Sequence, residues 1–402
     1  MKTTITSLLV ISLFSITLGY SQSEKIEGIH YLTGKPIVIE INGSLISKIK
    51  YPNKIVSKTY FVAPGLIDLQ INGYMGVDFS DQTLTSENFE KATKALWGKG
   101  ITCFLPTVIT ASRENLLKSF SLLAKASFTA DVAASVPGFH LEGPYISPEK
   151  GFRGAHLEKY IRKPDWNEFS AFQKASGNKI KLVTLAPETD GANSFIANCK
   201  KSGIVVSLGH HNGNASQIEN AVNAGATLST HLGNGCANLI DRHNNPIWPQ
   251  LANDKLSISI IADGFHLNKH EVSTFYKVKG IERTILVSDA LDLAGMPPGE
   301  YIRGERKVLL TPDVVKFPDE NVLAGAASPV SICVTNMMKF TGCTLGEAIQ
   351  MASTNPAKLM GWNNVGELAV GKRADLILFT VENDEMVIQK TIVAGKVVYE
   401  KN

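Results

Sequence analysis

The sequence has little of three features that would place it in other classes of protein. Its five cysteines are odd in number and none are spaced as CxxC, so they do not form the paired framework of a disulfide-stabilised protein. The 40 basic and 37 acidic side chains leave a net charge of +3 without any Lys/Arg run, so nucleic-acid binding has no electrostatic support. No GxGxxG motif follows a strand-like run, which disfavours a doubly wound dinucleotide-binding sheet.

Long apolar runs are also missing, except at the N-terminus. There, a positively charged start precedes an apolar core at 8–16, and the small residues Gly19 and Ser21 stand before a cleavage point at Gln22. The pattern predicts a signal peptide over 1–21 and an exported, periplasmic protein, or a cytoplasmic one if the signal is not used. A retained membrane anchor is the alternative, but the run is short for a span. We therefore expect no stable membrane insertion once the signal is removed.

The middle of the chain alternates strand-like runs with helical stretches such as 86–100 and 214–226. Eight short β-rich runs are each followed by polar or helical sequence. This alternation predicts an α/β fold, a (β/α)8 TIM barrel of parallel strands. The expected strands are residues 65–72, 102–107, 135–142, 181–186, 204–209, 226–230, 257–262 and 284–289.

Both ends of the chain are rich in short β-type runs. After the signal, such runs alternate with turns, and Asn42-Gly43 between two of them is a strong hairpin signal. The C-terminal segment shows the same pattern. We therefore expect 22–62 and 365–402 to form one small β-sandwich domain, with a barrel domain of residues 63–364 inserted between them.

Four polar residues each end an apolar run, which is where a parallel barrel presents catalytic residues. They are Glu142 in GFHLEGP, His210 in VVSLGHH, His231 in ATLSTHLGN and Asp289 in TILVSDA. Two imidazoles and a carboxylate satisfy a catalytic zinc and leave one position open for water. Asp289 is then placed to take a proton from that water and return it to a leaving amine. The pattern predicts a metal-dependent hydrolase.

The competing interpretation is structural. Histidines that end strands are often hydrogen-bonded core residues, and Asp289 could be the partner of an arginine. That interpretation predicts that no metal binds, which elemental analysis would test.

Several motifs, in order along the chain, resemble those of the amidohydrolase superfamily and, more narrowly, of the N-acetylglucosamine-6-phosphate deacetylases. They are PGLIDLQING (64–73), HLEGPYISPEKGFRGAH (140–156), SLGHH (207–211), THLGN (230–234), IADGFH (261–266), VSDA (287–290), LAGAAS (323–328), ASTNPAKLMG (352–361) and GELAVGKRADLILF (366–379). They cover nearly all of the chain after about residue 25. The resemblance implies a metal-bearing barrel with a small β-sandwich built from both chain ends.

The resemblance also implies roles for individual residues. It supports the three metal ligands and the catalytic aspartate already named. His156 matches a histidine that helps polarise the acetyl carbonyl. Asn234, the backbone at Gly235, and His266 match positions that contact the sugar.

The first strand bears on the number of metals. Most members of the superfamily carry HxH there and bind a second metal. This chain has Gln70 and Asn72, which point into the barrel with Asp68 because strand side chains alternate, and neutral amides are poor zinc ligands. One branch of the deacetylases shares this feature and uses a single metal. We expect one divalent ion, zinc, with two metals as the alternative.

The loop after His231 departs from the family pattern. In the deacetylases an arginine followed by Glu-Pro-Gly clamps the sugar phosphate from the neighbouring subunit, which implies a homodimer. Arg242 falls at that spacing, but His243-Asn244-Asn245 follows it. An exported enzyme would also not meet phosphorylated amino sugars, which are normally cytoplasmic. Phosphate binding by Arg242 is therefore an open question.

The expected activity is hydrolysis of the acetamide of an N-acetylated amino sugar, with or without a 6-phosphate. One alternative is another amidohydrolase reaction, on an N-acyl amino acid or a cyclic amide. A second is a non-catalytic, exported sugar-binding barrel. Retention of Asp289 beside three ligands argues against the second, because binding alone needs no base.

Overall fold

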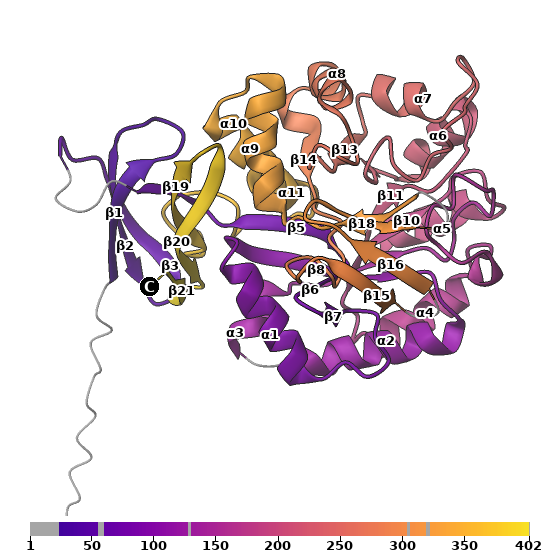
Figure 1. Cartoon of the computed structure of the whole chain (residues 1–402), viewed down its shortest axis with the longest axis horizontal. Coiled ribbons are helices and arrows are strands. Elements are labelled where there is room, and N and C mark those ends of the chain that lie inside the picture. Colours follow the sequence, from indigo (N-terminus) through magenta and orange to yellow (C-terminus); the bar gives the residue numbers. More distant parts are fainter. Residues whose placement is uncertain (1–23, 55–59, 128–129, 304–305, 319–321, 402) are drawn as a thin grey trace, which may run out of the picture.

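A computed structural model describes residues 24–54, 60–127, 130–303, 306–318 and 322–401. The signal peptide expected over 1–21 lies outside these ranges. The described chain forms a barrel of strands and helices with a smaller β-domain at one side (Figure 1). Within these ranges, no helix is both long and apolar enough to cross a membrane.

An eight-stranded parallel sheet forms the centre of the molecule, in the order β14-β13-β12-β11-β10-β9-β8-β5. Its strands are β5 (Leu66–Ile71), β8 (Ile101–Ile109), β9 (Phe139–Glu142), β10 (Ile180–Leu185), β11 (Val205–Leu208), β12 (Leu228–Ser229), β13 (Ser257–Ile260) and β14 (Thr284–Leu286). Each overlaps a strand expected from the sequence. The chain after β14 reaches β5, because the Asp289 N–H donates to the Gln70 carbonyl oxygen at 2.9 Å. The (β/α)8 prediction is confirmed.

Helices cover the outside of the sheet (Figure 1). They are α1 (Ser86–Trp97), α2 (Arg113–Ala126), α3 (Ala130–Ser135), α4 (Trp166–Ala175), α5 (Ala192–Lys201), α6 (Ala215–Ala224), α7 (Ile247–Ala252), α8 (Lys269–Lys279), α9 (Val330–Thr341), α10 (Leu345–Ala352) and α11 (Thr354–Leu359), with 3-10 turns η1 (Glu158–Tyr160) and η2 (Ile281–Arg283). In α1, the Thr85 side chain caps the first turn, and Phe89, Ala92 and Leu96 are buried. That spacing puts one apolar face on the barrel.

The small β-domain is a seven-stranded sheet built from both chain ends, as expected. Its order is β21-β20-β19-β4-β1-β2-β3. The strands are β1 (Glu24–His30), β2 (Pro36–Asn42), β3 (Leu45–Lys50), β4 (Phe61–Pro64), β19 (Leu376–Glu382), β20 (Glu385–Val393) and β21 (Lys396–Glu400). The Asn42-Gly43 hairpin is confirmed: β2 and β3 pair antiparallel across it, and Gly43 has a φ of 58°. Strand β4 joins the two ends, since it pairs with both β1 and β19.

A four-stranded antiparallel sheet between β14 and α9 was not expected from the sequence. It consists of β15 (Gly299–Arg303), β16 (Arg306–Leu310), β17 (Val314–Phe317) and β18 (Val322–Ala326). Its apolar side packs on Leu291 and Leu293, which follow Asp289. A short hairpin, β6 (Gly73–Tyr74) and β7 (Val77–Asp78), follows β5. Its Gly76 N–H donates to the Asp292 carbonyl oxygen at 2.7 Å, so both additions lie against the segment that carries Asp289.

Candidate active site

The candidate residues stand at the carboxyl ends of four barrel strands. Glu142 is the last residue of β9, and His210, His231 and Asp289 follow β11, β12 and β14 within three residues. The three that follow strands have positive φ values of 52°, 28° and 50°. A side chain other than glycine rarely adopts this conformation, and where it does the surroundings usually enforce it. The fold therefore holds these three residues in a strained backbone conformation.

Glu142, His210 and His231 form one buried cluster. Nε2 of His231 lies 3.1 Å from Nε2 of His210 and 3.1 Å from Oε1 of Glu142, and the remaining pair of atoms is 3.4 Å apart. Ligand atoms about 2.05 Å from a tetrahedral zinc would be about 3.3 Å apart. Among the described residues, this is the one group of three or more His, Cys, Asp or Glu side chains arranged to hold a metal ion. The donor set therefore fits a divalent cation.

The ring of His210 is fixed by its surroundings. Its Nδ1 lies 3.0 Å from the Phe152 carbonyl oxygen, so Nδ1–H donates there and Nε2 is free to bind a metal. Gly235 crowds the same ring: it has a φ of 58°, and a Cβ at this position would lie 2.7 Å from Nδ1 of His210. Only glycine can pass this close to the His210 ring, which explains why residue 235 is a glycine.

The charges of the cluster depend on one another. Burial raises the pKa of Glu142, but hydrogen bonds and charge interactions with His210 and His231 outweigh it and hold the pKa well below its usual value. Burial lowers the pKa of His231, but Glu142 outweighs it and raises that pKa. Without a cation, the carboxylate thus draws a proton to the His231 imidazole. A divalent metal would supply the same compensation.

Asp289 is held by amides from the first strand. Asn72 Nδ2 donates to its Oδ1 at 2.7 Å, and Gln70 Nε2 lies 3.2 Å from the same atom and donates to Oε1 of Glu142 at 2.8 Å. Gln70 and Asn72 are buried and face the barrel interior, as expected. Burial, and then the charge of Glu142, raise the pKa of Asp289. A carboxylate in this environment is suited to accept a proton.

His156 lies against the cluster and is neutral. Its ring centroid is 4.4 Å from that of His210, and its Nδ1 is 2.7 Å from the Thr110 hydroxyl. Burial, and then the charge of His210, lower the pKa of His156 to about 3. If the Thr110 hydroxyl donates to Nδ1, the ring proton is on Nε2, where it can be donated to a substrate oxygen.

Hydroxyl groups inside the barrel connect the strands that carry the ligands. His140 Nε2 and the Thr230 hydroxyl each lie 2.8 Å from the Thr184 hydroxyl, and Ser207 Oγ lies 2.5 Å from Thr230 Oγ1. These side chains come from β9, β10, β11 and the end of β12, directly below the metal ligands. Each is buried and hydrogen-bonded, so the layer fixes the relative position of these strands.

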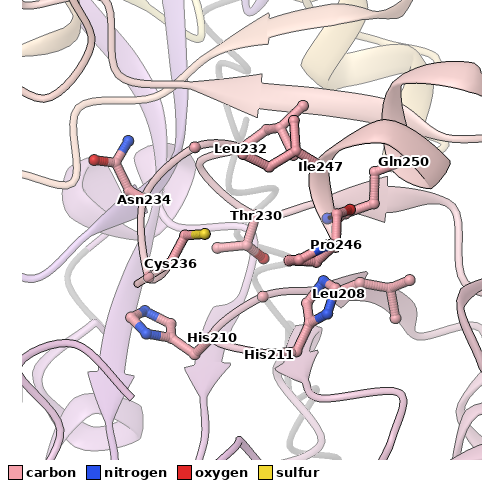
Figure 2. Close-up of a pocket in the computed structure, with 13 residues that line it drawn as sticks. Leu208, His210, His211, Thr230, Leu232, Asn234, Cys236, Pro246, Ile247 and Gln250 are labelled. Atoms are coloured by element: carbon pink, nitrogen blue, oxygen red, sulfur yellow. Dashed lines mark hydrogen bonds between the residues drawn. The ribbon is translucent and has the colours of Figure 1, made fainter. Parts of the chain in front are cut away.

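A small cavity of about 20 Å³ opens beside His210 (Figure 2). Asn234 and Gly235, two of the expected sugar-contacting positions, contribute to its wall, as do His211 and Gln250. Nδ2 of Asn234 is buried without a hydrogen-bond partner, so it is free to meet a polar ligand or water.

The other two expected substrate-binding residues lie outside this wall. His266 is oriented by Asp263, whose Oδ2 lies 2.7 Å from Nδ1 of His266. Arg242 is exposed in the loop before α7, and it does not line the cavity. The structure therefore brings together every expected site residue except Arg242 and, less directly, His266.

Sequence reasoning missed several partners of these residues. Asp263 stands three residues before His266 in IADGFH, which is a signal that could have been used. Thr110 gave no signal, because a threonine after a strand is common. The hydrogen bonds of Gln70 and Asn72 to Asp289 were missed because the first and last strands are far apart in sequence.

A comparison with protein families places this barrel and its metal-binding cluster. The model of the Amidohydrolase family matches residues 61–398, most of the chain. The chain therefore belongs to the amidohydrolase family.

Within that family, its similarity is to N-acetylglucosamine-6-phosphate deacetylases. The mouse enzyme of that name is 34% identical over 350 residues, which are 84% of this chain and 83% of the mouse protein. The Lysinibacillus sphaericus enzyme is 31% identical, over 85% of this chain and 86% of its own. The crystal structure of the Thermotoga maritima deacetylase has a TM-score of 0.83 at 30% identity, covering 94% of this chain and all of the other. The structure of a mutant deacetylase from Mycobacterium smegmatis, in complex with N-acetyl-D-glucosamine-6-phosphate, has a TM-score of 0.84 at 27% identity. The match covers 93% of this chain and 99% of the other.

Proposed function

We propose that this chain is a metal-dependent deacetylase that hydrolyses the acetamide of an N-acetylated amino sugar to the free amine and acetate. The substrate class is N-acetylglucosamine-6-phosphate or a related N-acetylhexosamine. The observation that carries the proposal is the convergence of three metal-ligand atoms within 4.8 Å of one another, beside a half-buried aspartate. The names of its relatives support the substrate class.

The resident metal proposed is a single zinc ion held by Glu142, His210 and His231. Two imidazoles and one carboxylate are a donor set of catalytic zinc sites. The chemistry that zinc supplies at such a site is Lewis-acid polarisation of a carbonyl and activation of water. The first strand offers amides that donate hydrogen bonds to carboxylates, which supports one ion rather than two.

The side chains divide the remaining work. Asp289 accepts the proton of the attacking water and returns it to the nitrogen of the leaving amine. The raised pKa of Asp289 favours its protonated form, which is the form that returns the proton. His156 donates a hydrogen bond from Nε2 to the acetyl oxygen as negative charge develops there. Gln70 and Asn72 hold the Asp289 carboxylate in place throughout.

Substrate contacts are proposed for Asn234, the Gly235 backbone and His266. The unpaired Nδ2 of Asn234 supports a hydrogen bond to a sugar hydroxyl. Asp263 orients the His266 ring, so its Nε2 is available to the sugar. Arg242 would reach a substrate phosphate only from a partner subunit, in a homodimer.

Export to the periplasm is proposed on the pattern of residues 1–21 alone. N-terminal sequencing of the mature protein after expression in a bacterium with a periplasm would test it. A cut before Gln22 supports export, and an intact N-terminus in the cytoplasm contradicts it.

Metal removal tests the catalytic proposal. Chelation of the purified enzyme should abolish acetate release from N-acetylglucosamine or its 6-phosphate, and one equivalent of zinc should restore it. Acetate release that is unaffected by complete metal removal, checked by elemental analysis, would overturn the proposal.

A further inference from the structure

Beside Asp289, one arginine joins two carboxylates from different segments. Nε of Arg303 on β15 donates to Oδ1 of Asp292 at 2.7 Å, and Nη2 lies 3.0 Å from Oδ2 of Asp78 on β7. The side chains of Arg303, Asp292 and Asp78 are 16%, 14% and 24% exposed, respectively, so the cluster is largely shielded from water. A single guanidinium therefore ties the turn after β14 to the hairpin after β5.

This turn begins with the strained residue Asp289. On one side its N–H donates to the Gln70 carbonyl oxygen at 2.9 Å, and on the other its carbonyl oxygen accepts the N–H of Ala326 on β18 at 3.0 Å. Three residues later, the Asp292 carbonyl oxygen accepts the Gly76 N–H at 2.7 Å. A left-handed conformation persists only where several contacts enforce it, and these contacts bracket the turn.

The remaining contacts of the turn are apolar. Leu291 and Leu293 pack on Val308 and Val315 of the β15–β18 sheet. Apolar contacts have no preferred direction, whereas a guanidinium that donates a hydrogen bond to Asp292 and forms an ion pair with Asp78 has a more defined geometry. The apolar contacts thus hold the 289–292 turn against the sheet, and Arg303 is the group best able to set its orientation.

The charge balance indicates what Arg303 does. Burial lowers its pKa, but the charges of Asp78 and Asp292, with a smaller contribution from Asp289, outweigh it and raise the pKa. The guanidinium is therefore always charged and lies within electrostatic reach of Asp289. Two carboxylates already neutralise it, so it is not available to bind an anionic substrate group.

We propose that Arg303 is a positioning residue for Asp289, which acts by holding Asp292 and Asp78 together and so fixing the turn from 289 to 292. The inference rests on the proposed function, since turnover by Asp289 is its first readout. Neither the sequence motifs nor the family match assigns a role to this arginine.

The first variant is Arg303→Met, compared with Arg283→Met. Arg283 precedes β14 at its other end and forms a partly exposed ion pair with Asp254 at 3.0 Å. Because displacement of a catalytic group by about 1 Å can cost about 100-fold, we expect Arg303→Met to lower kcat roughly 10- to 100-fold, with KM and zinc content unchanged. Arg283→Met should leave kcat at the wild-type value.

Conservative and paired variants separate positioning from general stability. Arg303→Lys should recover part of kcat, because lysine keeps the charge but not the two-sided geometry. Asp292→Asn should lower kcat less than Arg303→Met, and the double variant should be no slower than Arg303→Met. If Arg303→Met does not fold, Arg303→Lys and Asp292→Asn carry the test.

Wild-type kcat in the Arg303 variants would overturn the proposal. So would a change in KM alone, which would mean substrate contact, or additive losses in the double variant. If the wild type releases no acetate, the proposed function fails separately. Crystal structures of the wild type and Arg303→Lys would then test the positioning role of Arg303. A displaced Asp289 carboxylate in the variant supports that role, and an unmoved carboxylate overturns it.

Discussion

Asp289 is the residue on which the chemistry depends most. Asparagine in its place has nearly the same shape and can still meet Asn72 and Gln70, but it cannot accept a proton. We expect Asp289→Asn to keep the fold and the zinc and to lose about 10²- to 10⁴-fold in kcat. Acetate release and zinc content, measured on the same preparation, check this. Turnover close to wild type would remove Asp289 from the mechanism.

His231 is expected to act through the metal instead. Its Nε2 lies 3.1 Å from a ligand atom of each of the other two ligands, so its loss leaves two donors. His231→Ala should lower the zinc bound per chain after dialysis against a weak chelator. His270→Ala, on the surface of α8, is the matched control and should keep full zinc. Equal zinc in both variants would mean that His231 is not a ligand.

At this scale the sequence predicted the cluster because each candidate ligand ends an apolar run, a local pattern that a single chain displays. It did not predict the groups that orient them. Thr110, Asp263 and Arg303 reach the site from loops and from the added sheet, and their approach depends on how distant segments fold. Arg242 was located by spacing alone, and spacing could not show that it lies outside the cavity wall.

The layer of hydroxyl groups beneath the metal ligands is a feature of the strands together. Thr184→Val keeps the shape of the side chain but leaves His140 and Thr230 without their shared partner. We expect the free energy of unfolding to fall by about 1–3 kcal/mol, because buried polar groups lose a hydrogen bond. Zinc affinity should fall about 10- to 100-fold, as for other residues that support metal ligands.

Denaturant unfolding and chelator competition measure these two effects. Thr274→Val is the control, since its hydroxyl donates to the His270 carbonyl oxygen on the exposed side of α8. Wild-type zinc affinity in Thr184→Val would show that the layer does not support the ligands.

A strand in which apolar residues predominate was predictable, and a strand without them was not. All six residues of β5 are buried, and four of the six are apolar, which is typical of a core strand. In β15 no residue is fully buried, and burial alternates between intermediate and exposed. Such a strand has no apolar run to detect, so the sheet that covers the Asp289 turn went unnoticed.

For the whole molecule, buried neutral histidines set the response to acid. Burial lowers the pKa of His156 to about 3 and those of His140 and His211 to about 4, compared with 6.5 in an unfolded chain. Between these values the unfolded chain binds more protons than the folded one, so this stability is present above pH 6.5 and is lost as the pH falls toward 4. His231 does not contribute over this range, because its raised pKa leaves it protonated in both states below pH 6.5.

The metal-free protein should therefore lose up to about 4 kcal/mol of unfolding free energy per pH unit over that range, from a difference of about three protons. Urea unfolding at pH 7 and pH 5.5, with chelator present, measures it. Equal stability at the two pH values would show that these histidines are not buried in the neutral form.

The proposal that this barrel is an amino-sugar deacetylase has a direct test. The purified mature chain, loaded with zinc, is incubated with N-acetylglucosamine and, separately, with its 6-phosphate, and acetate and free amine are measured. We predict equimolar release of the two products from at least one substrate, and loss of that release in Asp289→Asn. A preference for the phosphate would assign Arg242 a role as a clamp, and a preference for the neutral sugar would fit an exported enzyme. No acetate from either sugar, from a fully zinc-loaded protein, would contradict the account.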